Sequence, residues 1–125
     1  LVVVIDDDKL VLESMRDLLG SWGWHVVTYA SAAEGLKTLG SSERRPDLII
    51  SDCRLADGKS GVDAIESLRR VFDAPIPALL ISGDTGLEQL REAKAAGYLL
   101  LRKPVSPMAL RTTVGRVLRT GGSLI

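Results

Sequence analysis

The sequence is poor in cysteine and histidine, and this scarcity excludes several kinds of site. Its 125 residues include one cysteine, Cys53, and one histidine, His25. A single cysteine forms no internal disulfide and fits a reducing compartment. A zinc site would need mostly carboxylate ligands, which is unusual for zinc in proteins. We therefore expect neither a disulfide framework nor a zinc centre.

The chain also lacks a net charge and a long apolar run. Sixteen Lys and Arg residues balance sixteen Asp and Glu residues. This balance argues against non-specific electrostatic binding to nucleic acid or to an anionic membrane. No apolar run approaches the roughly 20 residues of a membrane span, and no signal peptide opens the chain. We expect no direct contact of this domain with nucleic acid or membrane. We also expect a cytoplasmic location, which leaves open a membrane anchor in a parent protein.

The length indicates one domain with a core of its own. A chain of 125 residues is too short for two ordinary domains and buries roughly two-thirds of its unfolded surface. Residue 1 is Leu rather than Met and already lies in an apolar run, and residues 120–123 form a loose Thr-Gly-Gly-Ser end. We expect a single domain over 1–125, with its core at about 2–118, cut from a longer protein.

Five short apolar runs alternate with longer segments of helical periodicity. The runs are rich in Val, Ile and Leu, as expected for strands covered on both faces: Leu1–Ile5, His25–Tyr29, Asp47–Ser51, Ile76–Ile81 and Tyr98–Leu101. The segments between and after them predict helices over 8–20, 31–40, 61–72, 85–96 and 106–118. Regular alternation of this kind predicts an α/β fold, a flavodoxin-like (βα)5 three-layer sandwich with a parallel five-stranded sheet in the order 2-1-3-4-5.

Local signals define the ends of the predicted helices. Gly20 is expected to stop the first helix. Capping boxes open the second helix at Ser31 and the fourth at Thr85. Ser106-Pro107 supplies an N-cap and a proline at the first position of the last helix. The inward stripe of that helix is predicted to consist of Leu110, Val114, Val117 and Leu118.

Polar residues end four of the predicted strands. Asp6-Asp7-Asp8 follows the first strand and Asp52 the third. Ser82 follows the fourth and Lys103 the fifth. In the order 2-1-3-4-5 these strand ends are neighbours, so carboxylates, a hydroxyl and an ammonium would share one pocket. Clustered carboxylates repel one another, and Mg²⁺, a hard cation that couples to phosphate oxygens, relieves that repulsion.

This set of residues suits phosphoryl transfer to a carboxylate. An aspartate can act as a covalent nucleophile, and the transfer needs in-line positioning, a metal and a fixed positive charge. On this hypothesis Asp52 is the nucleophile, and Asp6 and Asp7 hold the metal. Lys103 supplies the fixed charge, and Ser82 donates a hydroxyl hydrogen bond to the phosphoryl group.

Four stretches at the predicted strand ends together carry a family resemblance: Val3–Asp8, Pro46–Asp52, Ile81–Gly83 and Arg102–Pro104. Through them the sequence resembles the receiver domain of two-component signalling, over about 2–118. The resemblance implies that Asp52 is the phosphoacceptor and that Asp7 and Asp52 are Mg²⁺ ligands. Asp6 would reach the ion directly or through water. The backbone carbonyl of Arg54 would be a further ligand.

The same resemblance implies the roles of the residues on the last two strands. Ser82 matches the switch hydroxyl of the family, and Lys103 matches its lysine. The Lys103-Pro104 bond is often cis in the family. Three further stretches, 54–58, 79–85 and 99–107, resemble the receiver of hybrid sensor histidine kinases, which often lies at the C-terminus of its parent.

The implied function is that of a phosphoacceptor domain in a phosphorelay. It would take a phosphoryl group from the phosphohistidine of a histidine kinase or a His-containing phosphotransfer domain, and lose it by hydrolysis. Self-phosphorylation and self-dephosphorylation make the word enzyme a matter of definition here. A stand-alone response regulator, and a pseudo-receiver that acts only as a protein-binding module, are the alternatives. A haloacid-dehalogenase-type phosphatase is a poor fit because Arg54 stands where that class has a second Asp.

Three positions depart from the family pattern. Ala56 stands where the family usually has Pro, in a loop that reaches Gly61 one residue later than usual. Leu100 occupies the aromatic switch position, and Tyr98 lies two residues earlier on the same predicted strand face. Arg54 could cover an acyl phosphate or point to solvent.

Cys53, on the opposite strand face from Asp52, is expected to be a small buried hydrophobe, with redox sensing as the alternative.

Overall fold

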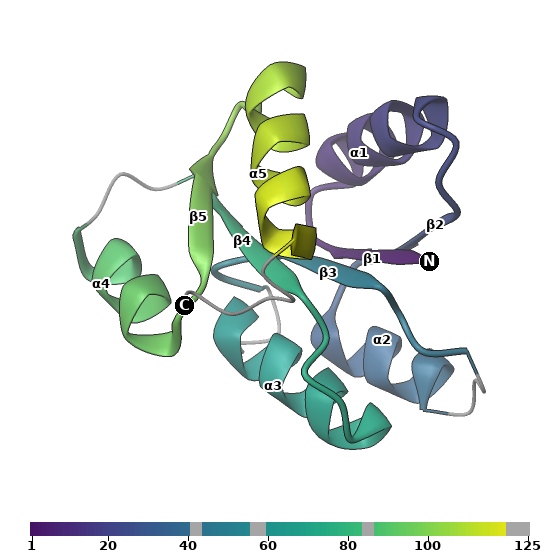
Figure 1. Cartoon of the computed structure of the whole chain (residues 1–125). Helices are drawn as coiled ribbons and strands as arrows, with labels where there is room; N and C mark the ends of the chain where they lie inside the picture. The colour runs from purple at the N-terminus through teal and green to yellow at the C-terminus, as the bar shows by residue number, and fades with distance from the viewer. Residues whose placement is uncertain (41–43, 56–59, 84–86, 120–125) are drawn as a thin grey trace.

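The computed structural model shows strands and helices in strict alternation (Figure 1). It describes residues 1–40, 44–55, 60–83 and 87–119, and for 87–89 the backbone alone. The strands in this part of the chain are β1 (Val2–Ile5), β2 (Val26–Tyr29), β3 (Leu48–Asp52), β4 (Ala78–Ser82) and β5 (Leu99–Arg102). The helices are α1 (Lys9–Ser21), α2 (Ala32–Leu39), α3 (Gly61–Phe72), α4 (Leu87–Ala96) and α5 (Pro107–Arg119).

All neighbouring strands pair in parallel, in the order β2-β1-β3-β4-β5. The predicted flavodoxin-like topology is therefore confirmed. The register aligns the strand ends, because Ile5 lies opposite Ser51, and Asp52 lies opposite Ile81. The residues that end β1, β3, β4 and β5 consequently reach the same edge of the sheet. The strand order reverses at β1 and β3, which is where ligands bind in sheets of this kind.

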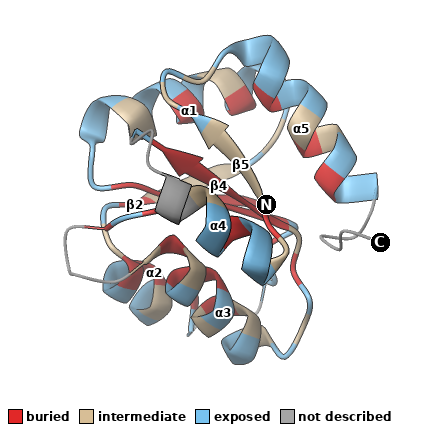
Figure 2. Ribbon diagram, turned by 90° about the vertical axis from the view of Figure 1, so that its left-hand side faces the viewer, coloured by how far each residue is buried: buried red, intermediate tan, exposed pale blue. Residues whose placement is uncertain are grey.

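Two layers of helices cover the sheet, and strand alternation divides the core between them. On one face, Val4, Ile50 and Ile81 pack in a cluster with Leu19 of α1 and Leu110 of α5. The other face packs against α2 and α3, and its cluster includes Val3, Ile49, Leu80, Ala32, Ile65 and Leu68. Figure 2 shows buried residues along the sheet and on the inward sides of the helices, with exposed residues outside. Roughly alternate residues of each strand thus belong to each cluster.

Short side chains cap the helices as the sequence predicts. The Ser31 hydroxyl accepts a hydrogen bond from the Glu34 backbone N–H at 3.1 Å, and the Glu34 carboxylate accepts one from the Ala30 N–H at 3.4 Å. Ser106 accepts from the Ala109 N–H at 3.0 Å. These contacts satisfy N–H groups that have no partner within the helix. The predicted cap at Thr85 lies outside the described residues.

Two details of the helix predictions are wrong. Gly20 does not stop α1, which continues to Ser21; the Trp22 N–H then closes the helix on the carbonyls of Leu19 and Gly20. The chain turns at Gly23 instead, whose φ of 86° is accessible to glycine at little cost. Leu118 is 41% exposed rather than inward. The buried stripe of α5 follows Leu110, Val114 and Val117, and the next residue lies beyond its edge.

The part of the chain that the structure describes contains no membrane-spanning helix. None of the helices there combines the length and the apolar character that a bilayer crossing requires.

Candidate functional site

Three charged side chains meet at the carboxyl edge of the sheet. Asp6 directly follows β1, Asp52 is the last residue of β3, and Lys103 directly follows β5. Side chains alternate between faces along a strand, and these three continue the rows of Val4 and Ile50 that face α1 and α5. The parallel register therefore brings them together, although nearly 100 residues separate the first from the last.

The Lys103 ammonium pairs with two carboxylates at once. Its Nζ lies 2.8 Å from Oδ2 of Asp6 and 3.2 Å from Oδ2 of Asp52, and it donates a hydrogen bond to the latter. The side chain of Asp6 is 1% exposed and that of Asp52 is 12% exposed. Both carboxylates are thus largely removed from water, where an uncompensated charge would be costly. The ammonium is their common compensating charge.

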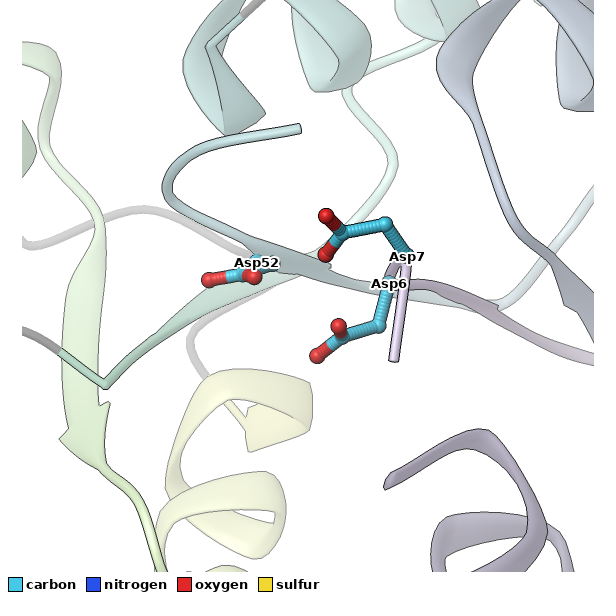
Figure 3. Close-up of side chains that lie close together, drawn as sticks. All are labelled: Asp6, Asp7 and Asp52. Atoms are coloured by element: carbon cyan, nitrogen blue, oxygen red, sulfur yellow. The ribbon is translucent and has the colours of Figure 1, made fainter. Parts of the chain in front are cut away.

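Asp7 completes a cluster of three carboxylates (Figure 3). One oxygen each from Asp6, Asp7 and Asp52 lies within 4.8 Å of the others. Oδ2 of Asp6 is buried and has no hydrogen-bond partner, its ion pair with Lys103 aside. Three carboxylates facing one ammonium keep an excess of negative charge. These donors fit a hard divalent cation such as Mg²⁺, which takes one or two carboxylates and retains water.

The site raises the pKa of both its acid and its base, which favours the neutral form of Asp52 and the charged form of Lys103. Burial, followed by the charge of Asp6, raises the pKa of the Asp52 carboxyl, and Lys103 only partly offsets this. Burial opposes the charged form of Lys103. The close approach of Asp6, at 2.8 Å, and the charges of both carboxylates outweigh it, so the pKa of Lys103 is raised. Lys103 therefore remains a cation at neutral pH.

Asp8 serves the helix rather than the cluster. Its carboxylate accepts a hydrogen bond from the Leu10 N–H at 3.0 Å and is the N-cap of α1. Its own N–H donates to Oδ1 of Asp6 at 2.9 Å, which fixes the orientation of that carboxylate. Capping is thus carried by the third acid of the run, and it leaves Asp6 and Asp7 facing Asp52.

Ser82 ends β4 on the other face of the sheet. It is buried, and the hydrogen bond from the Cys53 N–H to the Ile81 carbonyl places it beside Cys53, the residue after Asp52. Cys53 belongs to the cluster under α2 and α3, as the prediction of a small buried residue expects. Burial, with the charges of Asp52 and Glu92, raises the pKa of this thiol to about 11, so it is a poor nucleophile at neutral pH.

The chain after β3 bends back toward α3. Arg54 forms an isolated antiparallel bridge with Ser60, and its side chain is exposed. The predicted metal contact of its backbone carbonyl stays a prediction. Ala56, the first departure from the family pattern, lies outside the described residues. Ser60 then caps α3 by accepting a hydrogen bond from the Asp63 N–H at 3.1 Å.

Tyr98 is anchored to α3 by contacts that the sequence analysis missed. It is buried just before β5, and its hydroxyl donates to Oε1 of Glu66 at 2.5 Å. The Arg69 guanidinium lies 5.0 Å from the ring centroid. Burial and the Glu66 hydrogen bond raise the pKa of Tyr98. The sequence signal that could have indicated these contacts is the spacing of Glu66 and Arg69, because residues three apart lie on one face of a helix.

Gly61 is a second residue whose importance was missed. Its N–H donates to the Cys53 carbonyl at 2.8 Å. A Cβ at this position would lie 2.2 Å from the backbone oxygen of Asp52 and 2.8 Å from Cδ2 of Leu80. Only glycine fits here without displacing an atom. The start of α3 therefore packs directly against the backbone that carries Asp52.

Replacing Asp7 by Asn tests whether the acidic cluster is crowded. Asp7 contributes to raising the pKa of Asp52, so removing its charge relieves repulsion. We expect the metal-free Asp7→Asn protein to melt about 2 °C higher, from a gain of a few tenths of a kcal/mol. Its stabilisation by added Mg²⁺ should fall sharply, because a cation site has lost a ligand. Thermal unfolding with EDTA and with Mg²⁺ measures both effects.

A contrary outcome and a control variant test the expectation for Asp7→Asn. An Asp7→Asn protein that melts lower than the unsubstituted protein in EDTA, or that gains as much from Mg²⁺, would contradict a shared cation site. Asp63→Asn is the matched control, because Asp63 lies in the first turn of α3 and is not a member of the cluster. Its response to Mg²⁺ should equal that of the unsubstituted protein.

Comparison with known families gives one match over most of the chain. The model of the response regulator receiver domain matches residues 2–115. Among curated proteins, the phyllosphere-induced regulator PhyR of Methylorubrum extorquens is 27% identical over 117 residues, and the transcriptional regulatory protein PrrA of Mycobacterium tuberculosis is 35% identical over 130 residues. These alignments cover 94% and 98% of this chain, but 43% and 51% of the two relatives. The chain thus spans about half of their length.

Solved structures share the fold over almost the whole chain. The PhyR response regulator REC domain of Erythrobacter litoralis is 29% identical with a TM-score of 0.79, and covers 99% of this chain and 93% of its own. The chemotaxis protein CheY4 of Vibrio cholerae is 29% identical with a TM-score of 0.80, and covers 93% and 96%.

Proposed function

The chain belongs to the response regulator receiver domain family, and from that premise we propose that Asp52 accepts a phosphoryl group from a phosphohistidine. The observation that carries the proposal is the convergence of Asp6, Asp7 and Asp52 with Lys103 at one edge of the sheet. A carboxylate beside a fixed cation and two further acids is the arrangement that phosphoryl transfer requires.

In the proposed reaction, an oxygen of Asp52 attacks the phosphorus of the donor. The new P–O bond forms as the P–N bond to the donor imidazole breaks, and the leaving nitrogen keeps the electron pair and is protonated from solvent. Hydrolysis later breaks the bond to phosphorus and returns the carboxylate and inorganic phosphate. The exposed edge of Asp52, at 12% of its side chain, leaves an approach for the donor.

Lys103, the metal-binding acids and Ser82 would have different roles in this transfer. Lys103 already lies 3.2 Å from Oδ2 of Asp52, so its ammonium can follow a phosphoryl oxygen bound there. Asp6, Asp7 and Asp52, with the Arg54 carbonyl, would hold Mg²⁺. That ion, when bound, neutralises charge on the phosphoryl oxygens. Ser82 would donate its hydroxyl to the same group.

The donor and the cellular setting follow from the proposed chemistry. A histidine kinase or a His-containing phosphotransfer domain carries the phosphohistidine, and we place the reaction in the cytoplasm. A groove of about 450 Å³ between α1 and the segment after β5 leads to Lys103, and its lining includes Leu10, Met15 and Val105. Leu10 is 73% exposed there. This groove is where a protein donor can approach Asp52.

The parent protein is proposed to be a hybrid sensor histidine kinase. This rests on the stretches 54–58, 79–85 and 99–107. The curated relatives above are named regulators, which supports a response regulator as the second candidate. The reading frame around this chain distinguishes the two. Kinase domains encoded before Leu1 would support the hybrid, and an output domain after Ile125 the regulator.

The test of the proposed function is intact mass after incubation with acetyl phosphate. We expect a Mg²⁺-dependent gain of one phosphoryl group in the unsubstituted protein and none in Asp52→Asn, because an amide is not a nucleophile for this transfer. Circular dichroism should show the same fold in both. Phosphoramidate, a small donor with a P–N bond, serves as the second donor.

Uptake that survives in Asp52→Asn would refute the assignment of the acceptor. No uptake by the unsubstituted protein from either donor, together with intact Mg²⁺ binding, would favour a pseudo-receiver that acts only by binding. The pseudo-receiver is retained as an alternative because Leu100, which is not aromatic, occupies the aromatic switch position.

A further inference from the structure

Ser51, the residue before Asp52, is a serine inside the core. It is buried completely, and a buried hydroxyl requires a hydrogen-bond partner. Its hydroxyl donates to the backbone carbonyl of Asp52 at 3.0 Å. Ile49 and Ile50 belong to the clusters on opposite faces of the sheet, so alternation along β3 places Ser51 on the face of Ile49 and Asp52 on the other. Ser51 thus contacts the backbone of Asp52 from the face opposite to its carboxylate.

The Asp52 carbonyl lies beyond the last residue pair between β1 and β3. That pairing ends with Ile5 opposite Ser51. The peptide that joins Asp52 to Cys53 is trans, so its C=O and N–H point in opposite directions. The Cys53 N–H donates to the Ile81 carbonyl of β4 at 2.9 Å, and the Asp52 carbonyl therefore points to the β1 side. The Ser51 hydroxyl provides a donor there, past the end of the β1 ladder.

The start of α3 contacts the same stretch of backbone. The Gly61 N–H donates to the Cys53 carbonyl at 2.8 Å, and a Cβ on Gly61 would lie 2.2 Å from the Asp52 backbone oxygen. The peptide after Asp52 is thus bonded to β4 at its N–H and to Ser51 at its carbonyl, and it packs against α3. Its orientation sets the direction of the Asp52 side chain and the path of the chain to Arg54, whose carbonyl is a proposed Mg²⁺ ligand.

We infer that Ser51 is a positioning residue for the cation site: its hydroxyl fixes the peptide between Asp52 and Cys53, and with it the oxygen atoms that would bind Mg²⁺. The inference rests on the proposed function. Ser51 acts through the backbone, because its side chain lies on the face opposite to the carboxylates. Hydrogen bonds behind metal ligands typically contribute about 10–100-fold to metal affinity.

Ser51→Ala removes the hydroxyl and leaves every carboxylate in place. We expect Mg²⁺ to bind about tenfold more weakly to this variant in isothermal titration calorimetry. In metal-free protein, NMR should show the Cys53 amide exchanging about tenfold faster relative to the amide of Ile50, because the peptide has lost one of its hydrogen bonds. Phosphoryl uptake at limiting Mg²⁺ should fall by the same factor as the affinity.

Ile49→Val is the matched control for a loss of stability alone. Ile49 is buried two residues earlier on the same strand and the same face, and it makes no side-chain hydrogen bond. We expect both variants to melt about 4 °C lower than the unsubstituted protein. The Mg²⁺ affinity and the relative exchange of the Cys53 amide should not change in Ile49→Val. Ser51→Thr keeps the hydroxyl and should retain the affinity.

The outcomes separate the inference from the proposed function. Unchanged Mg²⁺ affinity in Ser51→Ala overturns the inference, and so does an equal loss in Ile49→Val or in Ser51→Thr. Absence of Mg²⁺ binding by the unsubstituted protein overturns it too. Absence of a phosphoryl gain by the unsubstituted protein overturns the proposed function instead, and the Mg²⁺ affinities and the Cys53 exchange rates still decide whether Ser51 positions the cation site.

Discussion

Replacing Gly61 by Ala should unfold the protein about 10 °C earlier and remove most of its phosphoryl uptake. The added Cβ would lie 2.2 Å from the backbone oxygen of Asp52, and 2.8 Å from Cδ2 of Leu80. The first of these atoms belongs to β3, which is paired on both sides and cannot move freely. Overpacking of this kind costs about 3 kcal/mol, which corresponds to the stated shift for a domain of this size.

The loss of uptake has a separate cause from the loss of stability. Relief of the clash must move either the start of α3 or the end of β3, and the second movement displaces Asp52. A displacement of about 1 Å at a reacting group can cost a hundredfold in rate. We therefore expect uptake to stay low at temperatures where circular dichroism shows that Gly61→Ala is still folded.

Gly20→Ala is the matched control, because it adds the same methyl group inside α1 where a Cβ meets nothing within 4 Å. It should stabilise the protein by about 0.5–1 kcal/mol, since alanine loses less backbone entropy in a helix. Equal melting temperatures for Gly61→Ala and the unsubstituted protein would show that the Asp52 backbone does not restrict α3.

The difference between Gly61 and Gly20 also shows what a sequence conveys. The sequence identifies both as glycines near helix ends, and it predicted a structural role for the wrong one. What gives Gly61 its role is the distance between α3 and β3, and no local pattern encodes that distance.

The strands were predictable because apolar runs and burial coincide: every residue of β1 is buried, as its unbroken run of apolar residues indicates.

The same distinction holds for the candidate site. Polar residues at strand ends, with the order 2-1-3-4-5, predicted that Asp6, Asp52 and Lys103 would meet. The sequence did not show that Ser82 leaves the sheet on the face opposite to Asp52. That result depends on the register of β3 against β4, and a shift of one residue would reverse the face. Register is set by the packing of the whole sheet.

Replacing Lys103 by Met should give the other large effect, because it leaves two buried carboxylates without their cation. The ammonium pairs with Asp6 at 2.8 Å and with Asp52 at 3.2 Å. Removing one member of a buried ion pair typically costs 3–5 kcal/mol. Lys103 is partly exposed, so we expect a loss of about 2–3 kcal/mol in the free energy of unfolding at pH 7 in EDTA. Urea denaturation measures it.

The pH dependence of this loss has a definite sign. Without Lys103, burial and Asp6 act unopposed and raise the pKa of Asp52 further above its ordinary value of 3.8. A carboxyl with a raised pKa binds protons in the folded protein before it does so in the unfolded chain. Stability therefore increases as pH falls through the folded pKa of Asp52. The deficit of Lys103→Met should shrink on mild acidification. Added Mg²⁺ should also reduce it.

Two further variants decide whether the charge is the cause. Lys103→Met combined with Asp6→Asn should recover much of the lost stability, because the most buried carboxylate no longer carries a charge. Lys94→Met removes the same charge from an exposed position on α4 and should change stability by less than about 0.5 kcal/mol. If the double variant is no more stable than Lys103→Met, the loss comes from packing of the lysine stem. Recovered stability in the double variant would show that the carboxylates of the acidic cluster repel one another. That repulsion is the property that makes the cluster a cation site.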